Sequence, residues 1–112
     1  MALHESLAAG RWHQMSLAEQ MANIGSEFGR ALKAFKTQNQ TRFEPAFSRM
    51  LELISLTVID PRWDYYRARE INRLKEHICE GFFGDLPHQD LESLEKYFTY
   101  FGIARANERR LG

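Results

Sequence analysis

The sequence is short of cysteine and of long apolar runs, and each shortage excludes a class of protein. Cys79 is the only cysteine among the 112 residues, so neither an internal disulfide nor a zinc site built from cysteines is possible. No apolar stretch approaches the roughly 20 residues that span a bilayer, and we expect no signal peptide. These observations predict a cytoplasmic protein that makes no membrane contact.

The chain also lacks net charge, because 15 Lys and Arg residues balance 15 Asp and Glu residues. A dedicated nucleic-acid binder usually carries a basic excess that neutralises phosphates. The global charge therefore gives no support to such a role, although a local patch could still bind phosphates. The small self-repulsion of a neutral chain permits oligomers.

Glycine and proline are scarce as well, with seven and three residues, and the breaks they make leave segments of helical length. Apolar residues recur at spacings of three and four within each segment, as in amphipathic helices. Because each apolar stripe must be buried on another, this pattern favours an antiparallel four-helix bundle. We predict one all-α domain over residues 1–112, with an N-terminal arm at 1–14 and helices at about 16–36, 42–59, 61–83 and 90–109.

Capping patterns mark the predicted helix boundaries. The segments Ser16–Glu19 and Thr41–Glu44 both fit the capping box, in which two side chains satisfy backbone N–H groups of the first helical turn. Pro45 would then lie in the first turn, where proline is tolerated. Asp60–Pro61 indicates a tight corner before the third helix, with a kink inside one long helix as the alternative.

Small residues form a second stripe on the first predicted helix. Glycine inside a helix costs about 1 kcal/mol relative to alanine, so two glycines on one face indicate close approach of a neighbour. We interpret the stripe as a candidate interface of a homo-oligomer; the simpler alternative is that this helix is the most buried one of the bundle. The stripe consists of Ala18, Ala22, Gly25 and Gly29.

Arginine occurs on the apolar side of two predicted helices. On a helical wheel Arg67 falls in the middle of the apolar stripe of the third helix, which includes Trp63, Ile71 and Leu74. Arg105 lies near the Phe98–Phe101 direction of the fourth helix. An unpaired buried charge is very costly. Either the ends of the bundle are accessible to solvent, or these two arginines face a partner.

A polar stripe on the third predicted helix is a candidate for catalysis. A histidine near a carboxylate and an arginine can perform general acid–base chemistry. The simpler alternative, which we favour, is an ordinary surface pair between Glu70 and Arg73, so an enzyme is not our leading expectation. The stripe consists of Tyr66, Glu70, Arg73 and His77.

Basic residues also cluster locally, although the net charge of the chain is zero. With aromatic rings nearby, they could contact the phosphates of RNA or DNA and stack on its bases. A solvated face is the alternative, and the neutral net charge favours it. The candidate binding residues are Arg62, Arg67, Arg69, Arg73, Arg109, Arg110 and Tyr66.

Metal and cofactor sites have little support in the sequence. The Glu-x-x-His pairs of di-iron bundles are absent, and no glycine-rich phosphate loop follows a strand. Asp85 and His88 are possible ligands in a loop, and His4 and His13 lie in the arm. We expect no metal and no cofactor.

Parts of the sequence resemble those of small uncharacterised bacterial proteins, namely Trp12–Gln20, Asn23–Glu27, Leu53–Trp63 and Lys96–Phe98. By size and helix pattern, the chain also resembles the four-helix-bundle proteins of 23S rRNA intervening sequences and their Avd-like relatives, the accessory proteins of diversity-generating retroelements. That resemblance implies ring-like oligomers that bind nucleic acid or a reverse transcriptase. Arg73 and His77 are similar to the arginine–histidine signature of helical ribonuclease toxins, but with a shorter spacing.

The leading hypothesis is a non-enzymatic bundle that works by self-association and by binding a protein partner. It depends on the wide apolar arc of the first helix and on the large share of aromatic residues, 12% of the chain. A nucleic-acid-associated accessory protein is the alternative, and a ribonuclease-like enzyme is the third reading.

Overall fold

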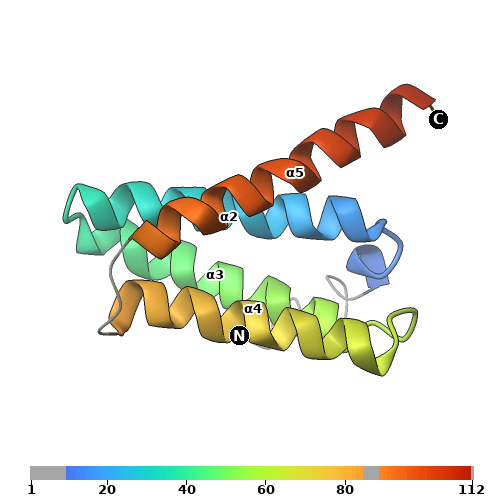
Figure 1. The fold of residues 1–112 in the computed structure, drawn as a ribbon, viewed down its shortest axis with the longest axis horizontal. Helices are drawn as coiled ribbons and strands as arrows, with labels where there is room; N and C mark the ends of the chain where they lie inside the picture. The colour runs from blue at the N-terminus through green and yellow to red at the C-terminus, as the bar shows by residue number, and fades with distance from the viewer. Residues whose placement is uncertain (1–9, 85–88, 112) are drawn as a thin grey trace.

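The computed structural model describes residues 10–84 and 89–111, and this part of the chain is helical and without strands. A short helical turn at residues 10–12 precedes four long helices (Figure 1). Their bounds are Leu17–Lys36 for α2, Gln40–Val58 for α3, Tyr65–Phe83 for α4 and Gln89–Leu111 for α5. The predicted all-α fold class is therefore confirmed. Within these described ranges, no helix is long and apolar enough to cross a membrane.

The four long helices run in alternating directions along the molecule (Figure 1). α2 packs against α3 and α5, and α4 packs against α3 and, over a smaller contact, against α5. α5 crosses the long axis at an angle, so its second half diverges from α4 (Figure 1). One side of the second half of α5 is therefore left without a helix against it.

α2 begins where its capping pattern predicts. The Ser16 side chain accepts a hydrogen bond from the backbone N–H of Glu19 at 3.1 Å, which satisfies one free donor of the first turn. The apolar stripe that follows is buried almost completely, because α3 and α5 cover it. Its most buried members are Met21, Ile24, Phe28, Ala31 and Leu32.

α3 begins two residues earlier than predicted, and Thr41–Glu44 does not act as its cap. The chain turns at Gln38, whose φ is 55°, and the Asn39 side chain then accepts a hydrogen bond from the backbone N–H of Arg42 at 3.2 Å. Asparagine caps a helix at least as well as threonine does. Pro45 consequently lies inside α3 rather than in its first turn.

α4 begins later than predicted, and this changes which side chains share its faces. The helix starts at Tyr65, where Asp64 is the cap and accepts a hydrogen bond from the backbone N–H of Arg67 at 2.8 Å. Asp60–Pro61 is therefore a corner, and the alternative of a kink is wrong. Because Trp63 lies before α4, the apolar stripe of this helix consists of Ile71, Leu74, Ile78 and Phe82.

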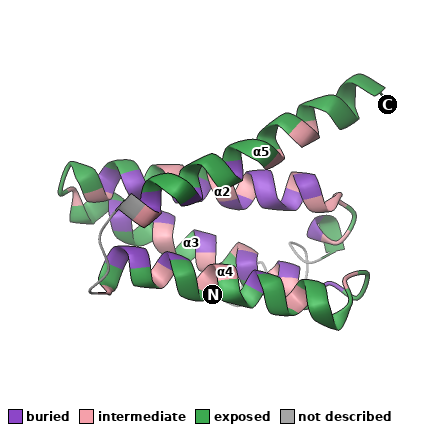
Figure 2. Ribbon diagram, in the orientation of Figure 1, coloured by how far each residue is buried: buried purple, intermediate pink, exposed green. Residues whose placement is uncertain are grey.

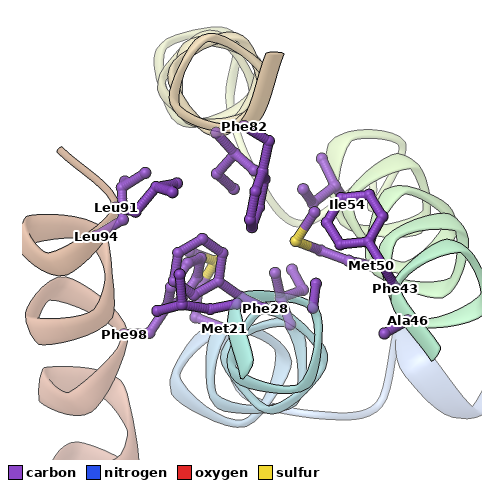
Figure 3. Close-up of a cluster of buried hydrophobic side chains, with 14 of the residues drawn as sticks. Met21, Phe28, Phe43, Ala46, Met50, Ile54, Phe82, Leu91, Leu94 and Phe98 are labelled. Carbon is purple, nitrogen blue, oxygen red and sulfur yellow. The ribbon is translucent and has the colours of Figure 1, made fainter. Parts of the chain in front are cut away.

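Phe28 of α2 lies at the centre of the core, among side chains from the other three long helices (Figure 3). Its ring centroid is 5.2 Å from that of Phe98 on α5 and 5.7 Å from that of Phe82 on α4. Phe82 in turn meets Phe43 of α3 at 5.2 Å. Burying one such side chain contributes about 1.5–3 kcal/mol, so these rings hold the four helices together.

The closest approach of α5 to α2 depends on a glycine. A Cβ atom added at Gly25 would lie 2.7 Å from the Cβ of Phe98. Real Cβ atoms do not come this close, so a larger residue would force α5 outwards. At Gly29, one turn further along α2, an added Cβ would meet nothing within 4 Å.

Gly25→Ala is expected to lower the free energy of unfolding by about 1–3 kcal/mol. The clash with Phe98 outweighs the gain of about 1 kcal/mol in helix propensity. Gly29→Ala is the matched control, and it is expected to raise the free energy of unfolding by up to about 1 kcal/mol. Urea titration measures both changes, and equal effects of the two substitutions would contradict the close contact.

Candidate functional site

The most polar part of the interior lies where α3 turns into α4. Asp60 is 1% exposed, and the side chain of Gln20 from α2 is fully buried beside it. Gln20 Nε2 donates a hydrogen bond to Asp60 Oδ2 at 2.8 Å. A carboxylate from the corner is thus bound by an amide from another helix.

Arg62 encloses the same carboxylate from the solvent side. Its Nε and its backbone N–H each donate to Asp60 Oδ1 at 3.0 Å, and its Nη2 donates to Asp60 Oδ2 at 2.6 Å. The same Nη2 donates to the carbonyl oxygen of Met15 at 2.6 Å. The Arg62 side chain thus binds both oxygens of the carboxylate, and this bidentate geometry is the strongest form of arginine–carboxylate pairing.

Two tryptophans complete the arrangement. Trp63 Nε1 donates to Gln20 Oε1 at 2.9 Å, and Gln20 Nε2 donates to the carbonyl oxygen of Trp12, also at 2.9 Å. Trp12 Nε1 donates to Thr57 Oγ1 at 2.9 Å, and the Arg62 guanidinium lies 4.5 Å above the Trp63 ring. We call these connected side chains the Asp60 network; they are Trp12, Gln20, Thr57, Asp60, Arg62 and Trp63.

The surroundings of Asp60 keep its carboxyl group ionised. The hydrogen bond from the Arg62 side chain lowers the pKa of Asp60 far below its usual 3.8, with a further lowering from Gln20, and these effects outweigh the opposing effect of burial. The same pairing raises the pKa of Arg62. Because both carboxylate oxygens already accept hydrogen bonds, the network offers no free group for proton transfer or for a metal.

This arrangement corrects the predicted basic patch. Arg62 lies before α4 and is bound to Asp60, so it does not share a helix face with Arg69 and Arg73. Arg69 and Arg73 are exposed on α4, and the structure shows no ion pair for them within the described residues. Arg109 and Arg110 are exposed at the far end of α5. The predicted residues therefore do not form one binding surface.

The predicted catalytic stripe is not brought together either. Glu70 Oε2 lies 4.0 Å from Arg67 rather than beside Arg73, and His77 Nε2 lies 3.5 Å from Asp90 Oδ2 on α5. The side chains of Glu70 and His77 are exposed, whereas that of Asp90 is 40% exposed. Tyr66 is 73% exposed and packs against the neighbouring Tyr65 ring.

The two arginines expected on apolar faces behave differently. Arg67 is exposed in the first turn of α4, where its Nη1 lies 4.0 Å from Glu70 Oε2. Arg105 is half-buried, and its Nε is the one buried side-chain nitrogen or oxygen within residues 10–84 and 89–111 that lacks a hydrogen-bond partner. Arg67 therefore faces solvent, whereas Arg105 carries an unsatisfied donor.

The small-residue stripe of α2 is largely used inside the molecule. Ala18 and Ala22 are buried, and the close neighbour of Gly25 is Phe98 of α5. Only Gly29 has open space around it among these four positions. Their burial does not support an intermolecular role for Ala18 and Ala22.

α5 carries an exposed stripe that the sequence analysis missed. Its second half is mostly exposed (Figure 2), and Tyr100 and Leu111 are 76% and 89% exposed. The spacing of three and four residues is visible in the sequence, but spacing alone does not separate this stripe from the inward-facing side of the same helix, which carries Phe98 and Phe101. We call this set the α5 outer stripe; it consists of the exposed residues Tyr97, Tyr100, Asn107 and Leu111 and the half-buried Ala104.

A groove between α2 and α3 was missed as well. It has a volume of about 780 Å³, and four basic residues line it against a single acidic one, Glu27. The basic residues come from two helices and meet only when these helices pack, so no local pattern in the sequence marks them. We call this the basic groove; its cations are Arg30, Lys33, Arg42 and Arg49.

Reactive side chains elsewhere show no sign of activation. Burial raises the pKa of the Cys79 thiol, which disfavours the nucleophilic thiolate. His13 Nε2 donates to the carbonyl oxygen of Leu56 at 2.9 Å. No group of three or more possible metal ligands occurs within the described residues, and the candidates His4, Asp85 and His88 lie outside them.

Comparisons with protein-family models, with curated proteins and with solved structures give no match for this chain. The resemblances to small bacterial proteins, to the intervening-sequence and Avd-like group and to ribonuclease toxins therefore stay predictions from the sequence.

Asp60→Asn is expected to lower the free energy of unfolding at neutral pH by about 3 kcal/mol, because Arg62 loses its ionic partner. The folded-state pKa of Asp60 lies below the unfolded value, so its contribution is present above about pH 4 and is lost as the pH falls further, by up to about 1.4 kcal/mol per pH unit. Below about pH 4, the stability of Asp60→Asn should therefore depend less on pH than that of the unmodified protein.

Glu70→Gln is the control for this experiment. Its side chain is 73% exposed, so the change in the free energy of unfolding should stay within about 0.5 kcal/mol. Urea titrations at a series of pH values measure all three proteins. The same acid dependence in Asp60→Asn and the unmodified protein would show that Asp60 contributes no pH-dependent stability.

Proposed function

We propose that the chain is an antiparallel four-helix bundle that works without catalysis, by self-association and by binding a protein partner. The observation that carries this proposal is the exposed α5 outer stripe. Apart from Asn107, the members of this stripe are apolar or aromatic, and a helix face with such residues at spacings of three and four packs well against another helix. Tyrosine, which supplies two of its members, is enriched at protein–protein interfaces.

A second copy of this chain is the partner that fits the stripe best. Antiparallel pairing of two α5 helices through this stripe would place Tyr97 of one copy against Leu111 of the other, so that apolar side chains meet at both ends of the contact. A two-fold axis generates this antiparallel pairing directly.

The polar clusters of the chain also favour a role without catalysis. The oxygens of Asp60 are occupied by Arg62 and Gln20, and the contact between His77 and Asp90 lies on an exposed surface. An active site usually needs a concave, partly dry pocket around its reacting groups. A cytoplasmic location remains a prediction from the low cysteine content.

Tyr100→Glu is expected to convert the oligomer to a monomer, because it places a charge within the α5 outer stripe. The Tyr100 side chain is 76% exposed in the monomer, so the fold of each chain should be unaffected. Light scattering at low and high protein concentration measures the mass, and circular dichroism confirms the helix content.

Tyr66→Glu on α4 is the matched control, because Tyr66 is 73% exposed and lies outside the outer stripe. It should leave the oligomer intact. A monomeric mass for the unmodified protein at every concentration would refute the proposal. Dissociation by both substitutions would show that the α5 outer stripe is not the specific interface.

A further inference from the structure

The basic groove brings positive charges together on both of its walls. Arg30 and Lys33 are exposed on α2, and Arg42 and Arg49 are exposed on α3. The buried carboxylate of Glu27 pairs with Arg30. Within the described residues, the structure shows no ion pair for the other three cations, so the groove holds an excess of positive charge in a neutral chain.

Such clustering attracts anions, because the exposed cations on the two facing walls add their positive potentials in the groove between them. Arginine binds phosphate especially well, because its planar guanidinium donates two parallel hydrogen bonds to phosphate oxygens. The groove is also open and long enough to follow two helices, which suits an extended anion.

An aromatic hollow adjoins the groove at the end of the bundle. It has a volume of about 260 Å³ and shares Ala34 and Asn39 with the groove. The ring of Phe83 in its wall is 64% exposed and is held edge-to-face by Phe47 at 5.2 Å. An exposed ring in a fixed orientation is a stacking surface for a nucleobase. The other rings of the hollow are Phe35, Phe43 and Phe82.

We propose that the basic groove binds the phosphates of single-stranded nucleic acid or of a nucleotide, while the aromatic hollow takes one of its bases. The combination of cations and an exposed ring favours this ligand over an acidic peptide, which has no planar base for the hollow. The site lies on α2, α3 and the end of α4, and it includes no residue of α5. It is therefore independent of the proposed self-association.

Fluorescence anisotropy with a labelled single-stranded RNA at low salt tests whether the basic groove binds phosphates. The double variant Arg42→Glu with Arg49→Glu is expected to bind at least about tenfold more weakly. Its plot of log affinity against log salt concentration should be shallower by about 1.4, because two phosphate contacts are lost. Arg69→Glu with Arg73→Glu on α4 makes the same change in net charge and should stay within about twofold of the unmodified protein.

Phe83→Ala tests whether the aromatic hollow binds a base. Loss of a stacking ring is expected to weaken RNA binding about fivefold or more. Because Phe83 also packs on Phe47, its thermal unfolding is measured alongside, and Phe83→Tyr, which keeps a stacking ring, should retain binding. Competition with a nucleoside triphosphate separates a free nucleotide from a nucleic-acid strand as the source of the ligand.

Several outcomes would overturn the proposal. The first is that the unmodified protein does not bind RNA at low salt. The second is that Arg69→Glu with Arg73→Glu loses as much RNA affinity as Arg42→Glu with Arg49→Glu. The third is that inorganic polyphosphate or an acidic peptide displaces the labelled RNA as well as unlabelled RNA does. The monomeric variant Tyr100→Glu should keep its affinity per chain, so the failure of self-association leaves this test intact.

Discussion

One buried carboxylate constrains a whole end of the molecule. Removing the charge of Asp60 from water is costly, so each of its oxygens has to be matched by a donor. Those donors come from α2, through Gln20, and from the corner itself, through Arg62. Arg62 also reaches the carbonyl oxygen of Met15 and so fixes the chain before α2. A hydrogen-bonded network of this kind specifies one geometry, because no other arrangement satisfies every partner.

The opposite end of the bundle is held by contacts of another kind. Phe35, Phe43, Phe82 and Phe83 pack their rings edge against face, and burial of apolar surface has little directionality. The first end therefore sets the register of the helices, and the second supplies much of the packing. The α5 outer stripe lies outside these two clusters, whereas the basic groove between α2 and α3 adjoins the phenylalanine-rich end, whose rings line the aromatic hollow.

Much of the fold was predictable, because helical spacing and capping are local properties. Ser16 caps α2 as its pattern indicates, whereas the start of α4 was misplaced since the Asp60 carboxylate binds Arg62 and Gln20 instead of capping a helix. That error placed Trp63 and Arg67 on a common apolar stripe. The basic groove could not be predicted at all, since Arg30 and Arg49 belong to different helices and meet only through packing.

The position of the tryptophans has a practical consequence for spectroscopy. The chain has two tryptophans, and both donate their indole N–H groups within the Asp60 network. Their intrinsic emission therefore reports the environment of a single end of the bundle. Fraying of the phenylalanine-rich end would leave this emission unchanged while helix content fell. Fluorescence and circular dichroism consequently report on different parts of this molecule. The difference between the unfolding midpoints that they give measures how cooperatively the two ends unfold.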